Sequence, residues 1–204
     1  MPLQIDRDLP IEYLRSVVEY DHSTGIFRWR ARICSRTNPG DIVGTMNKRG
    51  YLTASINKVD RPLHRVAWAY VHGDFPDDSI DHINGCRDDN RICNLRVANR
   101  AEQARNRKTR DDSETGIKGV RFDSKYDRWM VRIRTNNGRT TVGRFGTVQE
   151  ATAAYDMAAE LIFGAFARLN GERHEATITD DVVHSIGRLR RRIGIDTSDG
   201  HRRA

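Results

Sequence analysis

A stretch of nine residues without an apolar side chain divides this chain of 204 residues. Residues 107–115 are Arg, Lys, Thr, Asp, Ser and Glu only, whereas apolar residues recur in regular patterns on both sides. A segment of this kind has nothing to bury in a hydrophobic core, so we predict a linker between two small modules, residues 1–106 and 116–170. The length agrees with this division, because one domain commonly takes about 100 to 200 residues.

The chain carries an excess of positive charge. It has 35 Lys and Arg residues against 28 Asp and Glu residues, which gives a net charge of +7. This excess favours a nucleic acid as partner, ahead of an anionic membrane or an acidic protein. No apolar run approaches the length of about 20 residues that spans a bilayer, so we expect no membrane partner. The first ten residues include acids and no apolar leader, and we therefore expect the protein in the cytoplasm.

Residues 1–106 carry the patterns of a module that mixes helices and strands. Apolar residues at helical spacing predict one helix after Pro10 and another from about Leu63 to Gly73. Short strands are predicted at residues 26–29 and 52–56, where apolar residues follow turn residues or alternate with polar ones. We therefore expect an α+β fold.

Residues 79–107 form the most informative part of this module. Asn84-Gly85 lies between strand-like flanks and predicts a hairpin with a type I′ turn, because that turn needs positive φ at both central residues. Asp81 and His82 would then lie on a strand directly before the turn.

A helix is expected to follow the hairpin. Asn99 and Glu102 have the spacing of a capping box, which predicts a helix from Asn99 to about Lys108. Gln103 and Asn106 are three residues apart and would share one face of it. The prediction is a hairpin with a carboxylate and an imidazole, followed by a helix with two amide side chains.

This set of side chains suits a phosphodiesterase site with one metal ion. A hard cation such as Mg²⁺ takes oxygen ligands and keeps several waters, so one carboxylate and one amide oxygen are enough when a DNA phosphate supplies the rest. The metal then stabilises the leaving oxyanion. A neutral histidine, with an ordinary pKa of about 6.5, can take a proton from the attacking water.

The pattern resembles the HNH endonucleases, in particular their phage and intron-homing branch with the ββα-metal motif. The matching residues are Asp81-His82-Ile83-Asn84-Gly85, Asp89-Asn90-Arg91, Asn94-Leu95-Arg96, His64-Arg65 and Asn106. The resemblance implies a metal-dependent DNA nuclease with one Mg²⁺ or Mn²⁺ ion per site. His64 and Arg65 are expected to contact the DNA.

The resemblance also implies roles for the residues of the hairpin and helix. Asp81 is expected to bind the metal, His82 to act as general base, and Asn94 to brace the loop that holds His82. Gln103 would complete the metal site, with Asn106 as the second choice. The family usually has Asn or His at the position of Gln103.

Residues 116–170 carry the patterns of a second module. Strands are expected at residues 119–122, 129–134 and 139–145, with Asn137-Gly138 as the turn between the last two. Alternation along the second strand puts Trp129, Val131 and Ile133 on one face and Met130, Arg132 and Arg134 on the other. One face of the sheet is therefore predicted to be apolar and the other rich in arginine.

A helix is expected to cover the apolar face. Thr147 and Glu150 form a capping box, apolar residues recur at helical spacing from Ala151 to Ile162, and Gly164 ends the helix. The basic face is then left exposed, which favours contact with nucleic acid, because the arginine fork pairs with guanine O6 and N7 in the major groove.

This module resembles the plant Apetala-two or ethylene-response-factor DNA-binding domain, a three-stranded sheet with one helix. The matching residues are Gly119-Val120-Arg121, the stretch 129–134, Gly143-Arg144-Phe145-Gly146-Thr147, Glu150-Ala151, Ala154-Tyr155-Asp156, Ala158-Ala159 and Leu169-Asn170. The resemblance implies that outward arginines of the sheet contact bases and phosphates of double-stranded DNA.

The expected DNA contacts on this face are Arg121, Arg132, Arg134, Arg139 and Lys118. Two positions depart from the family. Thr141 replaces an outward Trp, and Arg132 replaces an outward Glu, so the DNA sequence preference of the family is not carried over.

Residues 171–204 are expected as a basic tail with a helix at about 180–193, because Val182, Ile186, Leu189 and Ile193 recur at helical spacing. The arginines of this helix would either contact phosphates or form a solvated charged face.

These motifs predict a homing-type endonuclease that hydrolyses phosphodiester bonds in double-stranded DNA, with the C-terminal sheet supplying recognition. One site per chain would nick one strand, and cutting both would need a homodimer. Two alternatives stay open. One is a catalytically inactive DNA-binding transcriptional regulator in which Gln103 has disabled the metal site, and the other is an RNA-binding protein that uses the basic sheet. A phage-encoded protein of this kind would act in the cytoplasm of the host cell.

Overall fold

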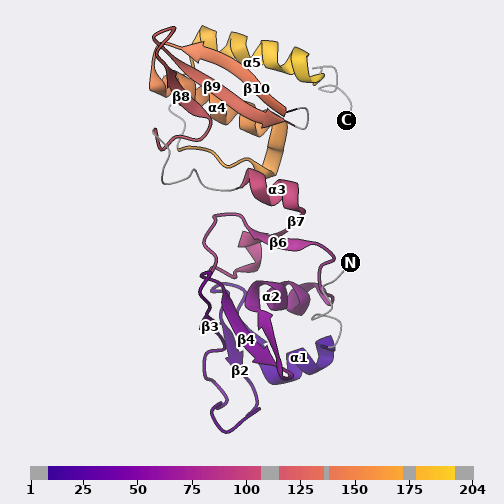
Figure 1. Ribbon diagram of the computed structural model, residues 1–204. Coiled ribbons are helices and arrows are strands. Elements are labelled where there is room, and N and C mark those ends of the chain that lie inside the picture. Colours follow the sequence, from indigo (N-terminus) through magenta and orange to yellow (C-terminus); the bar gives the residue numbers. More distant parts are fainter. Residues whose placement is uncertain (1–8, 107–114, 136–137, 172–177, 196–204) are drawn as a thin grey trace. The chain divides into compact units, whose positions relative to one another are not determined.

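The computed structural model describes residues 9–106, 115–135, 138–171 and 178–195 (Figure 1). The chain forms two compact units, Met1–Ala104 and Arg105–Ala204. Both combine helices with antiparallel strands, so the fold is α+β as predicted. Most of the predicted linker, residues 107–114, lies outside the described residues. None of the described helices has the length and apolar character needed to cross a membrane.

The first unit contains three small antiparallel sheets and three helices among its described residues (Figure 1). The order is α1 (Ile11–Val17), β1 (Val18–Tyr20), β2 (Phe27–Trp29), β3 (Thr45–Met46), β4 (Leu52–Ile56), β5 (Val59–Pro62), α2 (Leu63–His72), β6 (Ser79–His82), the 3-10 helix η2 (Ile92–Asn94), β7 (Leu95–Ala98) and α3 (Arg100–Arg105). β1 pairs with β2, β4 lies between β3 and β5, and β6 pairs with β7.

The two predicted helices of this unit form and supply its core. α1 follows Pro10, and α2 ends at Gly73, whose φ of 83° is the left-handed conformation that glycine favours at a helix end. Leu14 of α1 and Val66 of α2 are fully buried in one hydrophobic cluster. The apolar stripes of the two helices therefore meet in one core, where α1 also contacts β1 and α2 contacts β4 and β5.

The type I′ hairpin predicted at Asn84-Gly85 is wrong. β6 and β7 do pair, with Asp81 opposite Arg96, but they are joined by the long loop of residues 83–94. Gly85 has a φ of 75°, whereas Asn84 is not among the described residues with positive φ. The Gly85 N–H donates to the His82 carbonyl at 2.9 Å, so these residues begin the loop and do not close a hairpin.

The capping box that starts α3 is confirmed. The Asn99 side chain accepts hydrogen bonds from the N–H groups of Ala101 and Glu102 at 2.9 and 3.0 Å, and the Glu102 carboxylate accepts from the Asn99 N–H at 2.8 Å. α3 ends at Arg105, short of the predicted Lys108. Asn106 consequently follows the helix and does not share a helical face with Gln103, as the spacing had suggested.

The second unit is a three-stranded antiparallel sheet packed on helices (Figure 1). Its elements are β8 (Val120–Asp123), β9 (Arg128–Thr135), β10 (Gly138–Phe145), α4 (Val148–Phe163), the 3-10 helix η3 (Gly164–Phe166) and α5 (Asp180–Ile193). β9 lies in the centre, and α4 packs on it. Thr147 and Glu150 form the predicted capping box. The predicted turn residue Asn137 lies outside the described residues.

The helix α5 is part of this unit. The sequence placed residues 171–204 in a tail beyond the second module, with a helix at about 180–193. In the structure α5 packs against α4 and β10, and Val182, Ile186 and Leu189 are buried in the same cluster as Ala154 of α4. The apolar residues that predicted the helix therefore also dock it, because an amphipathic helix gains stability by burying its apolar face.

Gly119 offers a test of how tightly the sheet and α4 pack. Its φ is +74°, and a Cβ atom there would lie 2.2 Å from the Tyr155 ring and 2.6 Å from the Arg132 carbonyl oxygen. We expect Gly119→Ala to lower the free energy of unfolding by about 2 to 4 kcal/mol, from positive φ and overpacking together. Urea unfolding followed by circular dichroism measures the change.

The matched control is Gly187→Ala on α5. A Cβ atom at Gly187 would meet nothing within 4 Å. Alanine in a helix interior should stabilise the protein by about 0.5 to 1 kcal/mol. Equal stability of the Gly119 variant and the wild type would contradict the packing described above.

Candidate active site and nucleic-acid interface

His82 is held on β6 with one ring nitrogen engaged. Ile80 and His82 are buried on one side of the strand, and the exposed fraction of His82 is 4%. The His82 Nε2 atom lies 3.2 Å from the Oδ1 atom of Asn90. Because an amide oxygen only accepts hydrogen bonds, the neutral imidazole carries its proton on Nε2 and its lone pair on Nδ1.

A second imidazole lies beside His82. The ring of His64, on α2, is 5.2 Å from the ring of His82, and the Tyr51 ring is 5.2 Å from that of His64. Burial lowers the pKa of His64 to about 3, and burial also lowers the pKa of His82. Both imidazoles are therefore neutral at neutral pH, which is the state that accepts a proton.

Two buried polar atoms at this place have no hydrogen-bond partner within the described part of the chain. They are Nδ1 of His64 and Nδ2 of Asn90. Buried polar groups in proteins are nearly always paired with protein, water or a ligand. These two atoms beside His82 can thus pair with a polar molecule.

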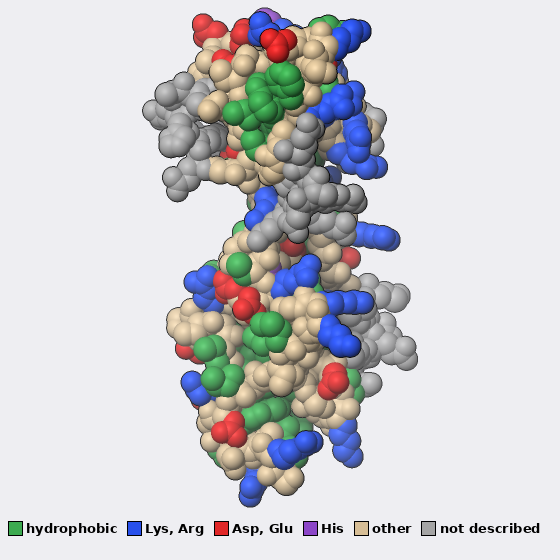
Figure 2. All heavy atoms as spheres, turned by 60° about the vertical axis from the view of Figure 1, so that its left-hand side comes forward, with side chains coloured by type: hydrophobic (Ala, Val, Ile, Leu, Met, Phe, Trp, Pro, Cys, Tyr) green, Lys and Arg blue, Asp and Glu red, His purple; other side chains and the backbone are tan. Residues whose placement is uncertain are grey.

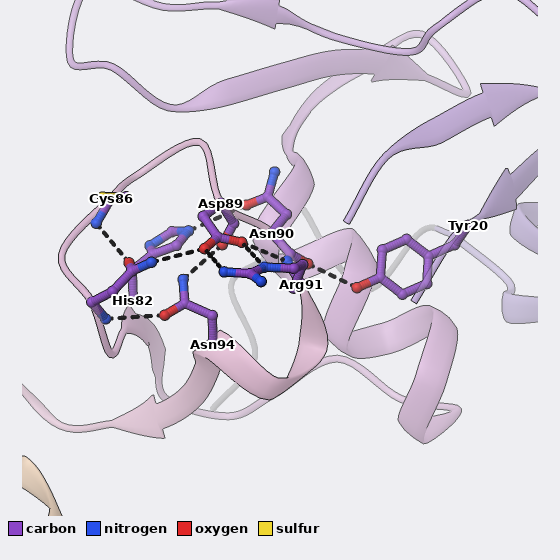
Figure 3. Close-up of polar contacts among 8 residues, drawn as sticks. Tyr20, His82, Cys86, Asp89, Asn90, Arg91 and Asn94 are labelled. Carbon is purple, nitrogen blue, oxygen red and sulfur yellow. Dashed lines mark hydrogen bonds and ion pairs between the residues drawn. The ribbon is translucent and has the colours of Figure 1, made fainter. Parts of the chain in front are cut away.

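Asn94 holds the loop that carries these groups (Figure 3). Its side-chain Oδ1 accepts from the Asn84 N–H at 3.0 Å, and its Nδ2 donates to the Asp89 carbonyl at 2.8 Å. The Asn94 backbone carbonyl accepts from the Ile83 N–H at 2.9 Å. One residue therefore joins both limbs of the loop, which is the geometry that a brace requires.

Asp89 ties the middle of the loop. Its carboxylate accepts hydrogen bonds from Arg91, at 2.8 and 2.6 Å, and from the Asn84 amide at 2.7 Å (Figure 3). These bonds, those from the Arg91 side chain first, lower the pKa of Asp89 to about 2. The sequence indicated Asp89 and Arg91 only as parts of a motif. The structure shows that they form an ion pair with each other.

The β1–β2 hairpin also contacts this loop, which no sequence pattern indicated. The Tyr20 hydroxyl donates to the Asn90 carbonyl at 2.8 Å (Figure 3). Burial raises the pKa of Tyr20 to about 12, so the hydroxyl stays protonated and can donate. The same hairpin carries a surface pocket of about 650 Å³ between Glu19 and Arg28, which Tyr20 lines and Asp81 and His82 do not.

Asp81 lies on the side of β6 opposite to His82 and forms an ion pair. Arg96, its partner across the β6–β7 pair, donates to Asp81 Oδ2 from Nε at 3.0 Å and from Nη2 at 2.7 Å. The Gln103 Nε2 atom lies 3.5 Å from the carbonyl oxygen of Ile80, the neighbour of Asp81. The structure thus brings Gln103 to β6, whereas Asn106 is buried beyond the end of α3.

A carboxylate and an amide oxygen fit the ligands that Mg²⁺ or Mn²⁺ takes. Among the described residues no group of three or more His, Cys, Asp and Glu side chains could hold a metal ion. A cation at Asp81 and Gln103 would therefore complete its shell with waters and phosphate oxygens, as hard cations at phosphate sites do.

Of the two DNA contacts predicted on α2, His64 lies at the candidate site and Arg65 does not. Arg65 is buried, with an exposed fraction of 4%. Its guanidinium donates at 2.8 Å to the carbonyls of Asp78 and Pro76, directly before β6. The predicted role of Arg65 is replaced by a structural one, because its side chain points into the protein and holds the chain that leads to the site.

The basic face of the second unit forms largely as expected. Arg121, Arg132, Arg134 and Arg139 are exposed. In the sheet register Arg132 lies opposite Thr141, and Arg134 lies opposite Arg139. On the face drawn in Figure 2, Lys and Arg side chains reach the surface of both units among hydrophobic and acidic ones.

A bulge in β10 adds Arg144 to this face. The register shifts between Thr141 and Gly143, so Arg144 lies opposite Met130 and Phe145 is buried. The bulge reverses the alternation along β10, so Arg144 lies on the same face as Arg139. The Arg144 Nε atom donates to Asp123 at 3.1 Å, and its guanidinium lies 4.3 Å from the centre of the Tyr126 ring.

Two side chains depart from the predicted faces. Met130 lies in register with the basic face, and yet only 2% of it is exposed. Lys118 precedes β8, and its ammonium donates to the Arg105 carbonyl at 2.5 Å. Burial lowers the pKa of Lys118 to about 8. Lys118 is therefore partly buried at the base of the sheet and does not stand on its exposed face.

The lowered pKa of Asp89 predicts a pH dependence of stability. An aspartate in the unfolded chain takes up its proton at about pH 4, whereas folded Asp89 stays ionised down to about pH 2. The stabilisation is complete above about pH 4 and is lost as the pH falls toward 2. We expect Asp89→Asn to lower the free energy of unfolding at pH 7 and to flatten its decline between pH 4 and 2.

Urea titrations at a series of pH values measure this decline, and Asp88→Asn is the control, because Asp88 is an exposed neighbour of like charge. If the decline in the free energy of unfolding between pH 4 and 2 is the same in Asp89→Asn as in the wild type, Asp89 does not stabilise the loop.

Comparisons with known proteins match two segments of the chain. Residues 61–105 match the model of the HNH endonuclease family, and residues 115–165 match the AP2 domain. A stretch of 69 residues is 39% identical to the Dehydration-responsive element-binding protein 2A of Arabidopsis thaliana and covers 33% of this chain. The match spans only 20% of that relative. No solved structure matches the chain significantly. The protein therefore carries a segment similar to the HNH endonucleases, at residues 61–105, and a segment similar to the AP2 domain, at residues 115–165.

Proposed function

We propose that this protein is a metal-dependent endonuclease of the homing type that hydrolyses phosphodiester bonds in duplex DNA. The observation that carries the proposal is the setting of His82. It lies inside the HNH-matched segment as a neutral imidazole whose Nε2 is engaged by Asn90. Beside it lie two buried polar atoms, His64 Nδ1 and Asn90 Nδ2, for which the described residues supply no partner. A base held in one tautomer beside polar groups that can bind water is what hydrolysis by water requires.

The roles of the residues follow from this geometry. Because Asn90 engages Nε2 of His82, Nδ1 is the atom that takes the proton from the attacking water. Asn94 keeps the His82 loop in place through its two side-chain hydrogen bonds. In this proposal His64, whose ring centre is 5.2 Å from that of His82, contacts the phosphate group as a neutral donor.

Asp81 and Gln103 are the residues that would hold the cation. Mg²⁺ or Mn²⁺, when bound, stabilises the charge that develops on the leaving oxygen. Arg96 binds the Asp81 carboxylate from the neighbouring strand and so fixes its direction.

The AP2-like sheet supplies recognition in this proposal. Its exposed arginines Arg121, Arg132, Arg134 and Arg139 contact bases and phosphates, and Arg144 joins them through the bulge. Duplex DNA is the partner, in the cytoplasm of a phage-infected host. One site per chain cuts one strand, so a homodimer would be needed to cut both.

A second candidate is a DNA-binding protein that does not cleave. The ion pair between Asp81 and Arg96 favours it, because a carboxylate already neutralised by an arginine attracts a cation less strongly. The unusual Gln103 favours it too. Under this alternative the sheet would bind DNA and the first unit would only add contacts.

Cleavage of a broad library of duplex DNA decides between the two candidates. With Mg²⁺ or Mn²⁺ we expect cleavage, and we expect His82→Ala to reduce its rate by about a hundredfold or more, because the general base is removed. Asp81→Asn and EDTA should act in the same direction. His184→Ala, which removes an exposed histidine on α5, is the matched control. Tight binding without metal-dependent cleavage would defeat the nuclease proposal and support the second candidate.

Binding measurements test the sheet. Each of Arg121→Ala, Arg132→Ala, Arg134→Ala and Arg139→Ala should weaken binding of duplex DNA by about 1 to 3 kcal/mol. Loss of a phosphate contact should also reduce the slope of the logarithm of the binding constant against the logarithm of salt concentration by about one. Loss of a base contact would leave this slope unchanged. Arg36→Ala, an exposed site in the first unit, is the control. At matched salt, a clear preference for RNA over duplex DNA would contradict the assignment.

A further inference from the structure

The β1–β2 hairpin lies outside both segments that match known families, yet it contacts the candidate active site. Tyr20 ends β1, and its hydroxyl donates a 2.8 Å hydrogen bond to the backbone carbonyl of Asn90. The side chain of the same Asn90 lies 3.2 Å from His82 Nε2 (Figure 3). Tyr20 and Asn90 are buried, with exposed fractions of 5% and 1%. A buried chain of hydrogen bonds thus runs from the hairpin to the imidazole.

The turn of the hairpin makes a second contact with the loop. A Cβ atom on Gly25 would lie 2.4 Å from the Arg91 nitrogen and 2.6 Å from the Asn90 carbonyl carbon. Only a residue without a side chain permits so close an approach of two backbones. Tyr20 and Gly25 therefore both approach the peptide group between Asn90 and Arg91, so the hairpin restricts the loop there through two residues.

The hairpin itself is anchored in the core of the first unit. The Tyr20 ring is 4.7 Å from the Phe27 ring and 5.8 Å from the Tyr70 ring. These contacts leave the Tyr20 hydroxyl little freedom to move. A hydrogen bond from a fixed donor restrains its acceptor more than a bond from a mobile surface side chain, because the donor has already lost its conformational entropy.

We propose that Tyr20 is a positioning residue of the nuclease site, whose hydroxyl fixes the Asn90 backbone so that the Asn90 amide holds His82 in one orientation and one tautomer. The proposal rests on the proposed function and deepens it. Tyr20 touches neither His82 nor the DNA phosphate in this account, and it acts through Asn90. Misplacement of a base by a small distance lowers the rate of the chemical step and leaves substrate binding intact.

Nitrogen NMR of the imidazoles tests the positioning without any need for cleavage. In the intact protein we expect His82 to show the Nε2–H tautomer, with its signals identified by their absence in His82→Ala. Tyr20→Phe keeps the ring and removes the hydroxyl, and it should give a mixture with the Nδ1–H tautomer. Tyr70→Phe removes a hydroxyl from the neighbouring ring and should leave the wild-type pattern. The wild-type tautomer in Tyr20→Phe would overturn the proposal.

Asn90→Ala is a second variant, which removes the middle link between Tyr20 and His82. It should release His82 in the same way, and adding Tyr20→Phe to it should change the His82 signals no further, because both act through one path. An additional change of equal size in the double variant would mean that Tyr20 acts on His82 by some other route, which contradicts the proposal.

Kinetics then separate this proposal from the proposed function. We expect Tyr20→Phe to lower kcat by about tenfold with little change in KM for duplex DNA, the loss of a buried hydrogen bond acting on the chemical step. If Tyr20→Phe changes the His82 tautomer but the wild-type protein does not cleave DNA, the positioning is supported and the nuclease proposal is defeated. Cleavage by Tyr20→Phe at the wild-type rate, with an unchanged tautomer, would defeat the positioning and leave the nuclease intact.

Discussion

The geometry of the candidate active site depends on the carboxamide of Asn94. The loop of residues 83–94 has no strand or helix over most of its length, so its backbone groups need other partners. Asn94 supplies two, at the Asn84 N–H and the Asp89 carbonyl, and its own carbonyl accepts from Ile83. Closing the loop in this way leaves His82, at the end of β6, 3.2 Å from Asn90.

The imidazoles of the candidate site and the ion pair of its loop lie at different depths in the first unit. His64 and His82 lie inside, where burial keeps the imidazoles neutral. The ion pair of Asp89 with Arg91 lies nearer the surface, where water offsets the desolvation of the charges. In the second unit the two faces of one sheet differ in the same way. Its apolar side chains face α4, and its arginines face solvent. Buried neutral imidazoles and an exposed arginine-rich sheet face thus occur in different units of one chain.

Features formed between residues close in the sequence were predicted well. The capping boxes at Asn99 and Thr147 formed because residues three apart satisfy each other's backbone groups. The loop after His82 was missed because Asn84-Gly85 is equally suited to begin a loop. The bulge in β10 was not predicted, because a bulge does not change composition or spacing. Arg65 was misjudged because only the fold shows that its charge points inward, to the carbonyls of Asp78 and Pro76.

The sequence by itself determined the α+β class, the presence of two patterned modules and the identities of His82, Asn94 and the sheet arginines as candidates, since these follow from residue type and short-range spacing. The tertiary structure alone decided that Asp81 pairs with Arg96, that α5 docks on the second unit, and that Tyr20 meets Asn90 across seventy positions of the chain. The physical reason is that burial and hydrogen-bond pairing depend on which distant segments share a core, and no local pattern records that choice.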